Sequence, residues 1–146
     1  MASENHSLGY AADLGAAEAW ALLASDGAAQ LVDVRTMAEW SFVGLPDLSG
    51  LGRTVHCVEW QSFPSMARNA DFAPQLGAAL GGRKDAAVLF LCRSGGRSRA
   101  AALATTQAGY TRAYNIAGGF EGDLDDTGRR GTMNGWKAAG LPWKQT

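Results

Sequence analysis

The fold is decided by one stretch near the middle of the chain, Ala86-Ala87-Val88-Leu89-Phe90-Leu91-Cys92-Arg93-Ser94-Gly95-Gly96-Arg97-Ser98. Its apolar first part predicts a buried strand. Cys92 ends this run and opens a short loop, and the alanine-rich pattern from Ser98 to about Gln107 predicts a helix. Gly95 and Gly96 allow the backbone to turn tightly. Cys92 is therefore expected where backbone N–H groups converge at the N-terminus of a helix.

This position favours negative charge on the Cys92 side chain. The helix dipole and the free N–H groups of the first turn attract an anion, and the successive N–H groups of the loop form an anion-binding nest. Arg93, Arg97 and Arg99 add positive charge nearby. We therefore expect Cys92 to be a thiolate at neutral pH and to act as a nucleophile. Ser98 is expected to cap the helix.

The spacing of the loop separates two chemistries. Cysteine-dependent phosphatases place five residues between the cysteine and an arginine that wraps the phosphate. Here Arg97 follows Cys92 after four residues and Arg99 after six, and Leu91 stands where phosphatases usually have histidine. A smaller cradle suits one sulfur atom attached to the cysteine, and a phosphatase or arsenate reductase is the disfavoured alternative. A buried, inert thiol is also an alternative, but it leaves the glycines and arginines unexplained.

Short apolar strands and helices alternate along the rest of the chain. Strands are predicted at 30–34, 54–58, 88–91 and 113–116, and helices at 13–23, 36–42, 71–80, 98–107 and 132–139, with Asp13 as the first N-cap. The segments 44–52, 61–69 and 121–131 are expected to be irregular. This alternation predicts an α/β fold with a mostly parallel sheet covered on both faces. Ligands of such sheets bind at the carboxyl ends of the strands, where Asp33, Cys57, Cys92 and Ala117 fall.

Length, charge and composition narrow the class of protein. The 146 residues suit one domain, 1–146, and the formal charge of −1 gives no indication of a nucleic-acid partner. Two cysteines are too few for a disulfide framework, and with two histidines at these spacings they form no metal-ligand set. No secretory signal and no membrane-spanning apolar run are visible. We expect a cytoplasmic protein without a membrane partner.

Three stretches resemble the signatures of single-domain rhodaneses, a family of sulfurtransferases. They are Leu31-Val32-Asp33-Val34-Arg35-Thr36-Met37-Ala38-Glu39-Trp40, the loop Cys92–Ser98, and Asn115-Ile116-Ala117-Gly118-Gly119-Phe120 with Gly140-Leu141-Pro142. The match extends from about residue 8 to residue 143. It implies a rhodanese-like three-layer fold, in which a central, mostly parallel five-stranded sheet carries helices on both faces.

The chain departs from the family pattern at two places. Gly44-Leu45-Pro46 stands where the family commonly has Gly-His-Ile-Pro. The connection from Gly119 to Trp136 is longer than usual and is expected to be an inserted surface loop. Such a loop either covers the mouth of the Cys92 site or lies beside it, and the second arrangement is favoured.

The resemblance implies that Cys92 takes sulfane sulfur from a donor such as thiosulfate, forms a persulfide and passes the sulfur to cyanide or a thiol. No cofactor or metal is implied. The partners are a small-molecule sulfur donor and acceptor, and a protein acceptor is an alternative. A non-turnover persulfide carrier or a rhodanese-like interaction module is the alternative function. The substrate-binding residues would be Arg93, Ser94, Gly95, Gly96, Arg97 and Ser98.

Supporting roles follow for several other residues. Asp33 is expected to orient loop backbone groups, and Arg35 to pair with Glu39 four residues later. Two roles stay open for Arg97: attraction of the anionic donor, or an ion pair that braces the loop. Cys57 is expected in the core rather than as a redox partner. Core packing is also the default for Trp60, which is the tryptophan best placed to line the pocket.

Overall fold

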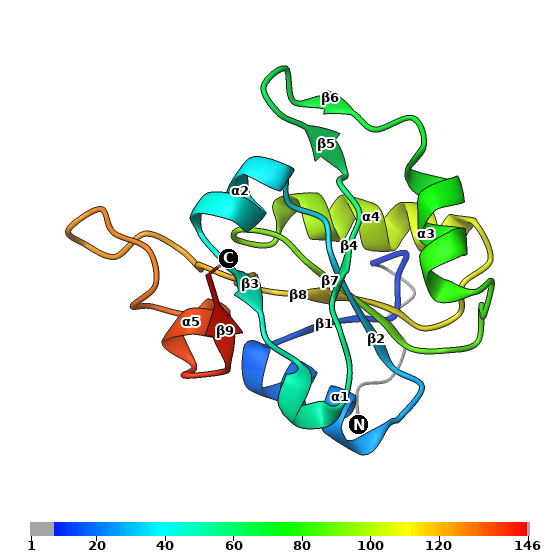
Figure 1. The fold of residues 1–146 in the computed structure, drawn as a ribbon, viewed down its shortest axis with the longest axis horizontal. Helices are drawn as coiled ribbons and strands as arrows, with labels where there is room; N and C mark the ends of the chain where they lie inside the picture. Colours follow the sequence, from blue (N-terminus) through cyan, green and yellow to red (C-terminus); the bar gives the residue numbers. More distant parts are fainter. Residues whose placement is uncertain (1–7, 146) are drawn as a thin grey trace.

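The computed structural model describes residues 8–145, which fold around a five-stranded sheet (Figure 1). The strand order is β1-β8-β7-β2-β4, and every neighbouring pair is parallel. The strands are β1 (Ala12–Leu14), β2 (Gln30–Asp33), β4 (His56–Cys57), β7 (Val88–Leu91) and β8 (Ala113–Ile116). The predicted α/β fold with a five-stranded parallel sheet is confirmed.

Helices cover both faces of this sheet. Helices α3 (Phe72–Leu80) and α4 (Gly96–Gln107) pack on one face, and α1 (Ala16–Ser25) and α5 (Gly135–Ala138) pack on the other (Figure 1). Successive side chains of a strand point to opposite faces. In β7, Phe90 therefore lies in the core beneath α3 and α4, and Leu91 in the core beneath α1 and α5. The unbroken apolar run of β7 reflects this burial on two faces.

The remaining elements lie outside the central sheet. Helix α2 (Met37–Phe42) follows β2, and the short 3-10 helix η1 (Ser49–Leu51) follows β3. Two small antiparallel pairs complete the fold: β3 (Leu45–Pro46) with β9 (Trp143–Lys144), and β5 (Gln61–Ser62) with β6 (Ala67–Arg68). The segment 61–69, predicted to be irregular, is therefore largely a hairpin. No helix within residues 8–145 is long and apolar enough to cross a membrane.

The predicted helix 13–23 was wrong at its start. Ala12–Leu14 forms edge strand β1, which pairs in register with β8 so that Asp13 lies opposite Asn115. Helix α1 begins only at Ala16, with Gly15 rather than Asp13 at its N-cap position. Three residues are too short for an alternating pattern, so the strand gave no periodic signal. Other bounds also shift: strand 54–58 shortens to His56–Cys57, and helix 132–139 to Gly135–Ala138.

Candidate active site

Cys92 lies at the carboxyl end of β7, directly before helix α4. The chain turns at Gly95, whose φ of 116° is readily adopted only by glycine. The thiol is buried, with 1% of the residue exposed, and its Sγ accepts the Gly95 N–H at 3.1 Å. The next N–H groups belong to the first turn of α4 and have no partner within the helix. The predicted juxtaposition of a thiol and a helix N-terminus is present.

Ser98 has a different role from the predicted helix cap. Gly95 occupies the N-cap position, and Ser98 lies inside α4 with its side chain fully buried. Its Oγ is 3.2 Å from Cys92 Sγ and 2.6 Å from Asn115 Oδ1. Asn115 on β8 in turn donates to Asp13. Asn115 opens the third rhodanese-like stretch, but no local sequence pattern indicates its contact with Ser98.

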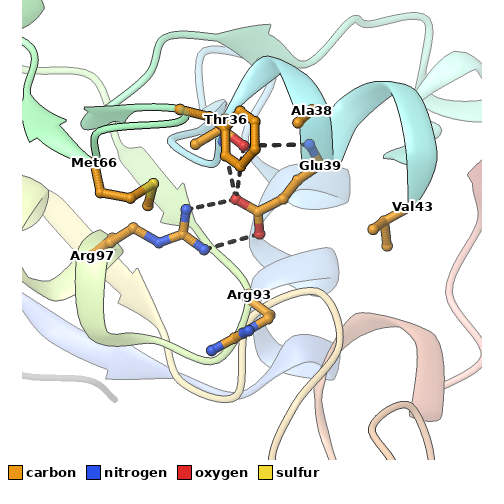
Figure 2. Close-up of a pocket in the computed structure, with 8 residues that line it drawn as sticks. Thr36, Ala38, Glu39, Val43, Met66, Arg93 and Arg97 are labelled. Carbon is orange, nitrogen blue, oxygen red and sulfur yellow. Dashed lines mark hydrogen bonds and ion pairs between the residues drawn. The ribbon is translucent and has the colours of Figure 1, made fainter.

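Arg97 is engaged in an ion pair with Glu39 of α2. Its Nη1 and Nη2 donate to the two carboxylate oxygens at 2.6 and 2.9 Å (Figure 2). Burial opposes the ionisation of Glu39, but the hydrogen bonds from Arg97 and from the Thr36 N–H outweigh it and lower the pKa of this carboxyl. The same pairing raises the pKa of Arg97. Of the two roles predicted for Arg97, the ion pair that braces the loop is therefore present, and Glu39 is the partner.

Arg35 pairs with Asp33 rather than with Glu39, so the predicted Arg35–Glu39 pair was wrong. Both residues are fully buried, and Arg35 Nη2 lies 2.6 Å from Asp33 Oδ2. Nη2 also donates to the Gly44 carbonyl at 2.7 Å, and the guanidinium lies 4.3 Å from the Phe120 ring centroid. Asp33 accepts the Arg35 backbone N–H at 3.1 Å. The pair thus ties the end of β2 to the loops that contain Gly44 and Phe120.

Arg93 extends from the loop to the wall of an open pocket (Figure 2). Within residues 8–145 no carboxylate forms an ion pair with Arg93. The pocket has a volume of about 340 Å³. Ser94 is half-buried and Gly96 is exposed. In the described part of the chain neither residue donates a hydrogen bond to Cys92 Sγ. The lining residues are Thr36, Ala38, Glu39, Val43, Phe63, Met66, Arg93 and Arg97.

The first residues of the long connection 119–136 form hydrogen bonds with the backbone carbonyl groups of the cysteine loop. The Phe120 N–H donates to the Cys92 carbonyl at 2.8 Å, and the Glu121 and Gly122 N–H groups donate to the Arg93 carbonyl at 3.0 and 3.1 Å. Beyond these contacts the connection projects away from the body of the fold (Figure 1, orange). The segment therefore lies beside the site and supports the loop backbone.

Cys57 is exposed at the edge of the sheet, so its predicted place in the core was wrong. Strand β4 is the last of the five, and one of its sides has no neighbouring strand. Partial burial of the thiol and the nearby Asp33 carboxylate raise the pKa of Cys57 to about 11.

Trp60 does not line the pocket beside Arg93; it is buried against Phe72, with ring centroids 4.9 Å apart.

The comparisons with known proteins agree with this architecture. Residues 12–146 match the family model described as the STR4 middle domain. The M. tuberculosis protein Rv0390 has a crystal structure that superposes with a TM-score of 0.86 at 50% identity, covering 94% of this chain and 99% of that one. Uncharacterized proteins of Rickettsia conorii and Rickettsia prowazekii are 39% and 37% identical over 127 residues, which is 87% of this chain and 92% of each relative.

A more distant structure shows the fold alone. The polysulfide-sulfur transferase homodimer of Wolinella succinogenes superposes with a TM-score of 0.60 at 21% identity, covering 92% of this chain and 79% of that one. The family model covers residues 12–146, and Rv0390 is 50% identical to this chain over nearly its whole length. The chain has the rhodanese-like fold and belongs to the STR4 middle domain family.

Proposed function

We propose that the protein is a sulfurtransferase in which Cys92 carries sulfur as a persulfide. The observation that carries this proposal is the position of Cys92 Sγ at the N-terminus of α4, 3.1 Å from the Gly95 N–H. A helix N-terminus stabilises an anion, and both a thiolate and a terminal persulfide are anions. Only four residues separate Cys92 from Arg97, and a loop of this length suits one added sulfur atom better than a tetrahedral oxyanion.

The reaction proceeds in two displacements with a covalent intermediate. The Cys92 thiolate attacks the outer sulfur of thiosulfate, the sulfur–sulfur bond of the donor breaks, and sulfite leaves with the bonding electron pair. Cyanide or a thiolate then attacks the outer sulfur of the Cys92 persulfide. The second sulfur–sulfur bond breaks, its electron pair returns to Cys92, and thiocyanate or a new persulfide is released.

The loop residues divide this work between them. Backbone N–H groups from Arg93 to Ser98 stabilise the charge on the outer sulfur, as oxyanion-hole donors do elsewhere. Arg93 attracts the anionic donor, because it is exposed and lies at the pocket wall. Arg97 contributes mainly through its pairing with Glu39, which holds the loop. Asp33 and Arg35 act as supporting residues.

The test is a donor panel with thiosulfate, 3-mercaptopyruvate and a polysulfide, run on the wild type and on Cys92→Ser. We expect an adduct of about 32 Da, one added sulfur, on wild-type Cys92, and thiocyanate formation once cyanide is added. Cys57→Ser is the matched control and should keep both. Absence of the adduct with every donor, or equal turnover in Cys92→Ser, would contradict the proposal.

A persulfide carrier is the second candidate, and two exposed apolar side chains that line the pocket favour it. Phe63 is 63% exposed and Met66 37% exposed, and both line the pocket beside Arg93. Large apolar side chains in this position suit contact with a protein acceptor. One sulfur loaded per chain without steady-state thiocyanate production would favour the carrier over the enzyme.

A phosphatase is disfavoured by the state of Arg97. An arginine that wraps a phosphate needs its fork of N–H donors free for oxygen, whereas both Nη atoms of Arg97 are bonded to Glu39. Hydrolysis of p-nitrophenyl phosphate that disappears in Cys92→Ser would revive this alternative.

A further inference from the structure

A chain of hydrogen-bonding groups connects Cys92 to the edge of the sheet. Ser98 Oγ lies 3.2 Å from Cys92 Sγ and 2.6 Å from Asn115 Oδ1. Asn115 Nδ2 lies 2.9 Å from Asp13 Oδ1, which also accepts the Tyr10 hydroxyl at 2.8 Å. Ser98 and Asn115 are fully buried, whereas Asp13 is exposed. An exposed carboxylate is thus linked to the sulfur through two buried side chains.

The chemistry of the partners fixes the direction of each hydrogen bond. A carboxylate only accepts, so Asn115 presents its –NH2 group to Asp13 and its carbonyl oxygen to Ser98. That carbonyl oxygen also only accepts, so Ser98 donates its single hydroxyl proton to Asn115. The Ser98 oxygen then faces Cys92 as an acceptor. It can take a hydrogen bond from a neutral thiol, but it has no proton left for a thiolate.

We propose that Asp13, acting through Asn115, turns the Ser98 hydroxyl proton away from Cys92 and so sets the balance between its thiol and thiolate forms. For Ser98 to donate to the thiolate, Asn115 Oδ1 must lose its partner in a fully buried place, which is unfavourable. Asp13 and Asn115 are positioning residues, because neither touches the sulfur.

The same arrangement suits the persulfide, a point that rests on the proposed function. In a persulfide the charge lies on the outer sulfur, and Sγ is bonded to two atoms and carries no proton. A donor from Ser98 is then not needed at Sγ. The network therefore disfavours the resting thiolate relative to the loaded form, and a less stabilised thiolate attacks a donor faster.

Two substitutions at Asp13 separate orientation from charge. Asp13→Ala removes the acceptor that orients Asn115, so the amide can reverse and the Ser98 proton can turn to Cys92. Asp13→Asn removes the same charge but keeps an acceptor oxygen in place. Both variants keep the other charged residues of the loop, α4, α2 and the end of β2, of which Arg97 interacts electrostatically with Cys92. These residues are Arg93, Arg97, Arg99, Glu39, Asp33 and Arg35.

The experiment is the pH profile of iodoacetamide alkylation at Cys92, resolved from Cys57 by peptide mass spectrometry. In Asp13→Ala we expect the pH of half-maximal alkylation rate to fall by about 1–2 units, the effect of one hydrogen bond to a charged group. In Asp13→Asn the profile should stay close to that of the wild type. In a Ser98→Ala background, Asp13→Ala should not shift the profile further, because the variant lacks the Ser98 hydroxyl proton that would turn toward Cys92.

Several outcomes would overturn the proposal. Equal shifts in Asp13→Ala and Asp13→Asn would mean that only the charge matters, and no shift in Asp13→Ala would mean that the sites are not coupled. Tyr10→Phe removes a donor to Asp13 and leaves Asn115 oriented; a shift as large as in Asp13→Ala would mean general loosening. Alkylation needs no sulfur donor, so a wild type that forms no persulfide would contradict the proposed function and leave this result intact.

Discussion

Arg97 and Glu39 fasten the cysteine loop to helix α2 through two parallel hydrogen bonds of 2.6 and 2.9 Å. Their side chains are only 16% and 19% exposed, so solvent screens the pair weakly. Glu39 Oε1 also accepts the Thr36 N–H at 3.1 Å. A bidentate, partly buried pair of this kind is stronger than an ordinary surface salt bridge. Its position between the loop and α2 suggests that it holds the loop in shape.

The first prediction concerns the stability that this pair provides. Glu39→Gln replaces an ionic pair by a weaker neutral contact, and we expect the free energy of unfolding to fall by about 1–2 kcal/mol. Urea denaturation of the wild type, Glu39→Gln, Arg97→Gln and the double variant measures it. The two single effects should not add in the double variant, and strict additivity would argue against a direct pair.

The second prediction is the pH dependence of the same contribution. The folded-state pKa of Glu39 lies below its usual value of 4.5, so the unfolded chain binds the proton more tightly. The stabilisation is therefore fully present above about pH 4.5 and is lost as the pH falls through the folded-state pKa. The difference in unfolding free energy between the wild type and Glu39→Gln should be constant from about pH 6 to 8 and shrink under acidic conditions. A difference that grows with acid would contradict it.

The features that could be predicted from the sequence are those encoded by residues adjacent in the chain. The run that ends at Cys92 and the Gly95 turn carry their signals in adjacent residues, so the strand, loop and helix follow from them. The Arg97–Glu39 and Asn115–Asp13 contacts join residues 58 and 102 positions apart. They depend on the strand order, which places β8 beside β1 and brings α2 to the carboxyl end of β7. No local pattern contains that order, so Asp13 looked like a helix cap.

The third prediction concerns Cys57. Because partial burial and the Asp33 carboxylate raise its pKa to about 11, Cys57 is a neutral thiol at pH 7–8 despite its exposed position. Its alkylation by iodoacetamide should be slow near neutrality and should rise about tenfold per pH unit up to about pH 11. Asp33→Asn removes the carboxylate and should move the rise to lower pH. A plateau below pH 9 in the wild type would show that the thiol is freely solvated.

The fourth prediction tests whether the close contact between Gly119 and the backbone of Cys92 and Arg93 is required for stability and for reactivity at Cys92. Gly119 has a φ of 61°, and a Cβ added there would overlap the Cys92 carbonyl oxygen and lie 2.6 Å from Arg93 C. These are backbone atoms of the cysteine loop, which cannot move away as a flexible side chain would. Gly119→Ala should lower the free energy of unfolding by about 2–4 kcal/mol, combining left-handed strain with overpacking. It should also slow persulfide formation at Cys92.

Gly128→Ala is the matched control for this prediction. Gly128 also has a positive φ, 80°, but a Cβ there would meet nothing within 4 Å. It should therefore lose only about 1 kcal/mol of stability from backbone strain and keep the reactivity of Cys92. The contrast isolates contact with the loop, because both variants add the same methyl group to a left-handed glycine. If Gly119→Ala behaved like Gly128→Ala in both measurements, the loop would tolerate displacement, and a rigid arrangement of N–H donors around Cys92 Sγ could not be the source of its chemistry.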